Sequence, residues 1–110
     1  MTPRDLPLIE RLNALNEECG ELIQASAKLI RTMSETGFTP VSRMEAREHL
    51  IEEIADVSVC MTALHDVAPL SDVGEIITEK AQRWEQRINA GQDPDARRKM
   101  MEGAYGEATE

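Results

Sequence analysis

The sequence is poor in aromatic residues and in cysteine, and this narrows the classes of fold it can adopt. Phe38, Trp84 and Tyr105 are the only aromatic residues among 110, whereas Ala, Leu, Ile, Met and Glu are abundant. This composition favours helices and argues against an all-β fold. Cys19 and Cys60 do not form a CxxC pair, so we expect two small buried thiols in a reducing compartment rather than a disulfide.

The sequence also lacks an excess of positive charge and a long apolar run. A formal net charge of −9 disfavours nucleic acid as a partner, because phosphate-binding surfaces are basic. No stretch approaches the roughly 20 apolar residues of a membrane-spanning helix. No apolar signal-peptide segment follows residues 1–5. We therefore expect a cytoplasmic protein with a single helical domain and no membrane contact.

Apolar residues recur at helical spacing in three segments that are separated by turn-forming residues. The predicted helices cover about 6–34, 43–67 and 72–90. Leu8 and Leu12 begin a heptad-like seam in the first helix. Ser42 and Glu45 fit a capping box at the start of the second. These patterns predict an all-α fold, an antiparallel bundle of three main helices.

The predicted bundle ends before the C-terminus and is incomplete in a single chain. Residues 1–91 are predicted to form the helical domain, and 92–110 form a charged, Gly-containing tail. The apolar stripes of the helices are too wide for a monomer of this size to bury. We therefore expect homo-oligomerisation to complete the bundle.

Residues 50–64 are acidic at their start and apolar at their end, with no Gly or Pro inside. A helix that is apolar on nearly every side is usually buried. Asp56 is therefore expected to be a carboxylate in a largely apolar setting. A buried, unpaired charge is strongly unfavourable, so Asp56 needs a partner or a cation.

The first and second predicted helices each carry an acidic triplet of the same spacing. The triplets are Glu17, Glu18 and Glu21, and Glu52, Glu53 and Asp56. Residues three and four apart share one face of a helix, so antiparallel packing can bring the two acidic faces together. Such faces repel each other unless a cation lies between them. Oxygen ligands without His or Cys suit Mg²⁺ or Mn²⁺ better than zinc.

Acids at these positions have two other interpretations, as solvated charges or as ligands of a di-iron site. Most helical Glu residues are solvated charges, and each acid taken singly fits that description. A di-iron bundle requires a Glu-x-x-His motif on two helices, and neither His49 nor His65 has a Glu three residues before it. The repeated pattern of two acids, two small or apolar residues and a third acid favours a divalent cation.

Glu18-x-x-Glu21 and Glu53-x-x-Asp56 together resemble the ExxE…ExxD signature of the MazG-like all-α nucleoside triphosphate pyrophosphohydrolases. Residues 16–25 resemble the EExGEL helix of that family, and 52–57 resemble its EELADV helix. Lys80, followed by Arg83 and Arg87, is similar to the family's downstream basic helix. The resemblance covers about residues 5–91.

This resemblance implies an enzyme that hydrolyses (deoxy)nucleoside triphosphates to the nucleoside monophosphate and pyrophosphate. The residues that would hold Mg²⁺, or Mn²⁺ in its place, are Glu18, Glu21, Glu53 and Asp56. Glu17 or Glu52 would orient or deprotonate the attacking water, and the residues give no reason to choose between them. The candidates for binding the substrate are Lys80, Arg83, Lys28 and Asn16.

The family also forms dimers or tetramers with the nucleotide between subunits, which agrees with the wide apolar stripes. Two alternatives stand beside the enzyme. The chain could be a non-catalytic helical oligomer whose acids hold a metal structurally, or a nucleotide-binding regulator that retains the metal site without turnover. The sequence favours the enzyme because all four implied ligands are present.

Overall fold

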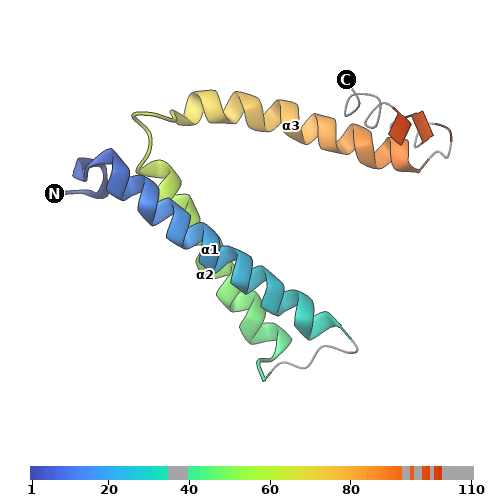
Figure 1. Cartoon of the computed structure of the whole chain (residues 1–110), viewed down its shortest axis with the longest axis horizontal. Coiled ribbons are helices and arrows are strands. Elements are labelled where there is room, and N and C mark those ends of the chain that lie inside the picture. The colour runs from blue at the N-terminus through green and yellow to red at the C-terminus, as the bar shows by residue number, and fades with distance from the viewer. Residues whose placement is uncertain (35–39, 93–94, 96–97, 100, 103–110) are drawn as a thin grey trace. The chain divides into compact units, whose positions relative to one another are not determined.

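The described part of the chain is entirely helical. The computed structural model describes residues 1–34, 40–92, 95, 98–99 and 101–102. Its elements are η1 (Pro3–Asp5), α1 (Leu8–Met33), α2 (Arg43–Thr62) and α3 (Leu70–Gly91) (Figure 1). The all-α prediction is therefore confirmed for these residues. Most of the predicted tail at 92–110 lies outside the described residues.

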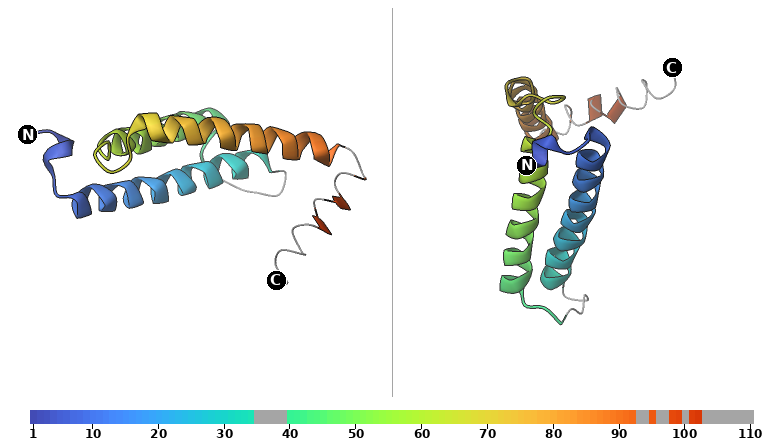
Figure 2. Two further views of the ribbon diagram at one scale, coloured as in Figure 1. Left: turned by 90° about the horizontal axis from the view of Figure 1, so that it is seen from above. Right: turned by 90° about the vertical axis from the view of Figure 1, so that its left-hand side faces the viewer.

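Helices α1 and α2 lie side by side and run in opposite directions, as Figures 1 and 2 show. Small side chains are buried in this hairpin: Ala25 on α1 is 0% exposed and Ala46 on α2 is 2% exposed. Small residues allow two helices to approach closely, because interaxial distance follows the size of the side chains at the contact. Leu64, just after α2, is the largest buried apolar residue. The antiparallel hairpin is the arrangement that the two acidic triplets required.

The helix ends agree with the sequence at one cap and differ at two others. The Ser42 hydroxyl accepts a hydrogen bond from the Glu45 N–H at 3.1 Å, so the predicted cap of α2 is confirmed. Helix α1 begins at Leu8 rather than at residue 6, because the Leu6 N–H bonds the Pro3 carbonyl and so caps the end of η1. Helix α2 ends at Thr62 rather than near 67, since the following residues form successive tight turns.

The chain divides into two compact units, Met1–Leu70 and Ser71–Glu110. The first unit contains η1, α1 and α2, and therefore both acidic triplets. The second contains nearly all of α3, an amphipathic helix whose large apolar residues include Ile76, Trp84 and Ile88. The place of α3 in a three-helix bundle stays a prediction. None of the described helices is both long and apolar enough to span a membrane.

Candidate metal centre

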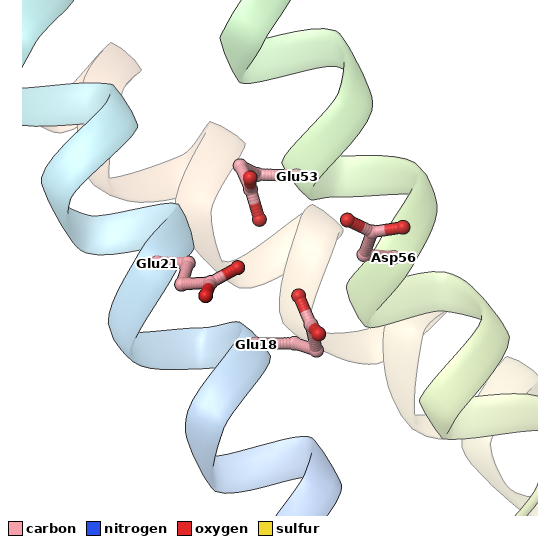
Figure 3. A group of neighbouring side chains, drawn as sticks. All are labelled: Glu18, Glu21, Glu53 and Asp56. Carbon is pink, nitrogen blue, oxygen red and sulfur yellow. The ribbon is translucent and has the colours of Figure 1, made fainter.

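Four carboxylates meet between α1 and α2 in the first unit (Figure 3). The acidic cluster consists of Glu18, Glu21, Glu53 and Asp56, and one oxygen from each lies within 4.8 Å of the other three. The i,i+3 spacing places each pair on one helix face, and the antiparallel hairpin turns the two faces toward each other. The structure thus brings together the four residues that the sequence predicted as metal ligands.

Glu53 is the buried member of the acidic cluster. Its exposed fraction is 6%, whereas Glu18 is half-buried and Asp56 is exposed. The expectation that Asp56 is the carboxylate in an apolar setting is therefore wrong. Asp56 lies three residues after Glu53, which turns it by about 60° around the axis of α2 and toward solvent. Ile54, the apolar residue next to Glu53 on the same helix, is also exposed.

Two oxygens of the acidic cluster, Glu18 Oε2 and Glu53 Oε2, are buried with no hydrogen-bond partner among the described residues. Buried polar atoms are nearly always paired, and an unpaired carboxylate oxygen is especially unfavourable. Oxygens on opposite sides of a cation are about 4.2 Å apart for Mg²⁺ and roughly 4.6–5.2 Å apart for Ca²⁺. A separation of up to 4.8 Å therefore fits one hard divalent cation, with small inward movements for Mg²⁺.

The pKa shifts in the acidic cluster also favour a bound cation. Burial raises the pKa of Glu18 above its ordinary value, and the neighbouring charges of Glu21 and Asp56 raise it further. Burial and the same two neighbours also raise the pKa of Glu53. Desolvation and like charge both disfavour the ionised form. A bound cation would reverse both effects, because it pairs with the buried charge.

One imidazole contacts the acidic cluster. His49 Nε2 lies 3.2 Å from Glu53 Oε1, and the imidazole lowers the pKa of Glu53 in opposition to the carboxylates. Sequence reasoning considered His49 only as an iron ligand and missed this contact. The available signal was the spacing, since residues four apart on a helix are neighbours.

The remaining predicted site residues lie outside the acidic cluster. Glu17 and Glu52 each precede a cluster residue, are turned by about 100° from it, and are exposed. On α1, Asn16 is exposed and Lys28 is half-buried. Lys80 and Arg83 are exposed on α3, in the second unit. The roles of these six residues stay predictions.

Sequence reasoning also missed a polar junction between the start of α1 and the end of α2. Arg11, which is 7% exposed, donates from Nη1 to the Ala63 carbonyl at 2.9 Å and from Nε to the Leu6 carbonyl at 2.9 Å. Its two terminal nitrogens also bond both carboxylate oxygens of Asp66, at 2.6 and 3.0 Å. The signal was weak: Arg11 follows Leu8 by three residues and so falls in line with the apolar seam.

Comparison with known proteins identifies no relative. No family model, no curated protein and no solved structure matches this chain. The function must therefore be inferred from the chemistry of the acidic cluster.

Proposed function

We propose that this protein is a Mg²⁺-dependent nucleoside triphosphate pyrophosphohydrolase of the MazG-like type. The observation that carries the proposal is the acidic cluster, four carboxylates within 4.8 Å on two antiparallel helices. The buried oxygens of Glu18 and Glu53 support a cation there, because they have no hydrogen-bond donor among the described residues. The all-oxygen donor set suits Mg²⁺, and Mn²⁺ is the expected substitute.

Each proposed residue has a distinct task. The four carboxylates of the acidic cluster would hold the cation, which when bound neutralises triphosphate charge and lowers the pKa of water. Glu17 or Glu52, each adjacent to a cluster residue, would accept the proton of the water that attacks phosphorus. Lys80 and Arg83 would bind phosphate oxygens. Lys28 is a further candidate for phosphate, and Asn16 for a base edge.

The proposal predicts release of pyrophosphate. The full chain is incubated with Mg²⁺ and a panel of canonical and modified (deoxy)nucleoside triphosphates, and the products are separated by ion-exchange chromatography. We expect nucleoside monophosphate and pyrophosphate in equal amounts, with Mg²⁺ or Mn²⁺ required and EDTA inhibitory. The panel also identifies the preferred base and sugar.

Other products would contradict the proposal in different ways. Release of inorganic phosphate alone would show that the scissile bond is assigned wrongly. No turnover on any nucleotide would leave the two non-catalytic alternatives. Nucleotide binding without turnover would identify a regulator, and no nucleotide binding would identify a helical oligomer that uses metal structurally.

We further propose that the chain works as a homo-oligomer, a dimer or a tetramer. Among the described residues, the buried apolar side chains are small apart from Leu64, whereas many large ones are exposed. These exposed residues include Ile9, Ile23, Ile51, Ile77 and Trp84. A soluble monomer rarely exposes large contiguous apolar patches, so a second copy is the expected cover.

The oligomer proposal predicts a mass of two or four chains by light scattering after gel filtration. Trp84 is the single tryptophan and is 69% exposed in the isolated chain. Its emission should therefore lie at shorter wavelength in the oligomer than in a dilute, dissociated sample, since burial removes it from water. A one-chain mass over a wide concentration range would contradict the proposal.

A further inference from the structure

The two carboxylate oxygens of Glu53 have different surroundings. Oε1 lies 3.2 Å from His49 Nε2. Oε2 is buried and has no hydrogen-bond partner in the part of the chain that the structure describes. Among the described residues, the mutually close ligand atoms at this place come from four carboxylates and no imidazole. His49 therefore contacts one oxygen of a cluster residue, Glu53 Oε1, without joining the acidic cluster.

We propose that His49 is a positioning residue that holds Glu53 Oε1 so that Oε2 is presented to the divalent cation. The inference rests on the cation site of the proposed function and not on hydrolysis. Glu has three rotatable side-chain bonds, and fixing them at the moment of binding opposes affinity. A contact that fixes Glu53 beforehand removes part of this loss.

The choice of Glu53 for this support follows from its place in the fold. Glu53 is the member of the acidic cluster that is nine-tenths buried, so a misplaced Oε2 cannot be compensated by solvent. His49 is one turn earlier on α2 and its side chain is 39% exposed, so Glu53 is contacted by a partly exposed neighbour on its own helix. Outer partners of metal ligands commonly change metal affinity by 10- to 100-fold, roughly, when they are removed.

Binding of Mn²⁺ to the full chain tests the inference without any nucleotide. The free Mn²⁺ signal is titrated by electron paramagnetic resonance for wild type, His49→Leu and His49→Gln. We expect His49→Leu to raise the Kd for Mn²⁺ by about tenfold or more, as for loss of an outer partner. His49→Gln should restore most of the affinity, because its amide nitrogen can contact Glu53 Oε1 in place of the imidazole nitrogen.

Two measurements separate positioning from other roles. His65→Leu is the matched control: His65 is exposed in the turns after α2, and its loss should leave Mn²⁺ affinity unchanged. The thermal midpoint in EDTA should be similar for wild type and for the two His49 variants. If both variants lose affinity and lower the midpoint alike, His49 acts through packing and the inference is wrong.

Further outcomes would also overturn it. Wild-type Mn²⁺ affinity in His49→Leu would show that the contact between His49 and Glu53 does not contribute to Mn²⁺ binding. A nitrogen coupling in the pulsed spectrum of bound Mn²⁺ that disappears in His49→Leu would make His49 a direct ligand. Mn²⁺ binding with the expected variant pattern but no pyrophosphate release would contradict the proposed enzyme alone. Pyrophosphate release with unchanged Mn²⁺ affinity in His49→Leu would contradict the role of His49 alone.

Discussion

Replacing Glu53 with Gln is expected to abolish Mg²⁺-dependent hydrolysis and, at the same time, to stabilise the metal-free protein. Gln keeps the size of the side chain but removes the negative charge that would bind the cation. A cation supplies several kcal/mol of transition-state stabilisation in such sites, so kcat/KM should fall at least about a hundredfold. Steady-state pyrophosphate release by wild type and Glu53→Gln measures this loss.

Glu53→Gln should stabilise the metal-free protein even though it removes activity, because the charge of Glu53 is unfavourable without a cation. Glu53 is 6% exposed, and its Oε2 has no hydrogen-bond partner within the described residues. Burial and the carboxylates of Glu21 and Asp56 both disfavour its ionised form. In EDTA, the thermal midpoint of Glu53→Gln should therefore lie above that of wild type. Added Mg²⁺ should raise the midpoint of wild type and raise that of the variant much less.

The pH dependence of stability follows from the same charges. The pKa values of Glu18 and Glu53 in the folded protein lie above the ordinary value of 4.5. Between 4.5 and those raised values the folded state binds more protons than the unfolded chain. In EDTA, wild type should therefore gain stability as the pH falls toward 5 and lose it as the pH rises through the raised values. Saturating Mg²⁺ or Glu53→Gln should reduce this dependence.

The choice of pH range avoids a second titration of opposite sign. The Arg11 guanidinium holds the pKa of Asp66 below its ordinary value of 3.8. Asp66 therefore contributes stability above 3.8 that is lost as the pH falls through its folded pKa. Measurements from pH 7 to pH 5 stay above this window, so they report mainly on the acidic cluster.

Glu48→Gln is the matched control for Glu53→Gln, because Glu48 is an exposed acid on the same helix and outside the acidic cluster. It should keep the stability, the pH dependence and the turnover of wild type. The cation site would be contradicted if Glu53→Gln matched wild type in thermal midpoint both in EDTA and in Mg²⁺.

Replacing Arg11 with Met is expected to give the largest loss of stability in the hairpin. Arg11 joins three segments, since it bonds the Leu6 carbonyl before α1, the Ala63 carbonyl at the end of α2 and the Asp66 carboxylate beyond it. A cation at a helix C-terminus also interacts favourably with the helix dipole. Losing the hydrogen bonds of this buried guanidinium, including those to the Leu6 and Ala63 carbonyls, should lower the thermal midpoint by roughly 10 °C or more.

Two further variants show which contacts of Arg11 contribute to the stability of the hairpin. Arg11→Lys should not restore stability, because an ammonium cannot bond both oxygens of Asp66 and a backbone carbonyl in the same geometry. Asp66→Asn should be less harmful than Arg11→Met, since the Asp66 side chain is 58% exposed and the bond to Ala63 remains. Midpoints are read by circular dichroism at fixed protein concentration, because assembly also affects them.

Arg47→Met is the control for Arg11→Met. Arg47 is exposed on α2, so its loss should change the midpoint little. If Arg11→Met melted within a degree or two of wild type, the buried junction would not stabilise the hairpin, and another contact would have to hold the end of α2 against the start of α1.

The sequence alone determined the helices and the members of the acidic cluster. Helical periodicity and the turn residues between the segments predicted α1, α2 and α3, and the Ser42 cap was predicted with its partner Glu45. The spacing of the acids placed each acidic triplet on one helix face, and the resemblance to the ExxE…ExxD signature selected Glu18, Glu21, Glu53 and Asp56 from them. These features are predictable because helix formation, capping and spacing depend on residues within one or two turns of each other.

Only the tertiary structure decided which acid is buried and what supports it. The rotation of α2 against α1 buries Glu53 and leaves Asp56 exposed, and periodicity could not fix that rotation because nearly every side of α2 is apolar after residue 54. The bonds from Arg11 to Ala63 and Asp66 join residues 52 and 55 apart in the chain. Such contacts follow from how two helices pack, and no local pattern encodes them.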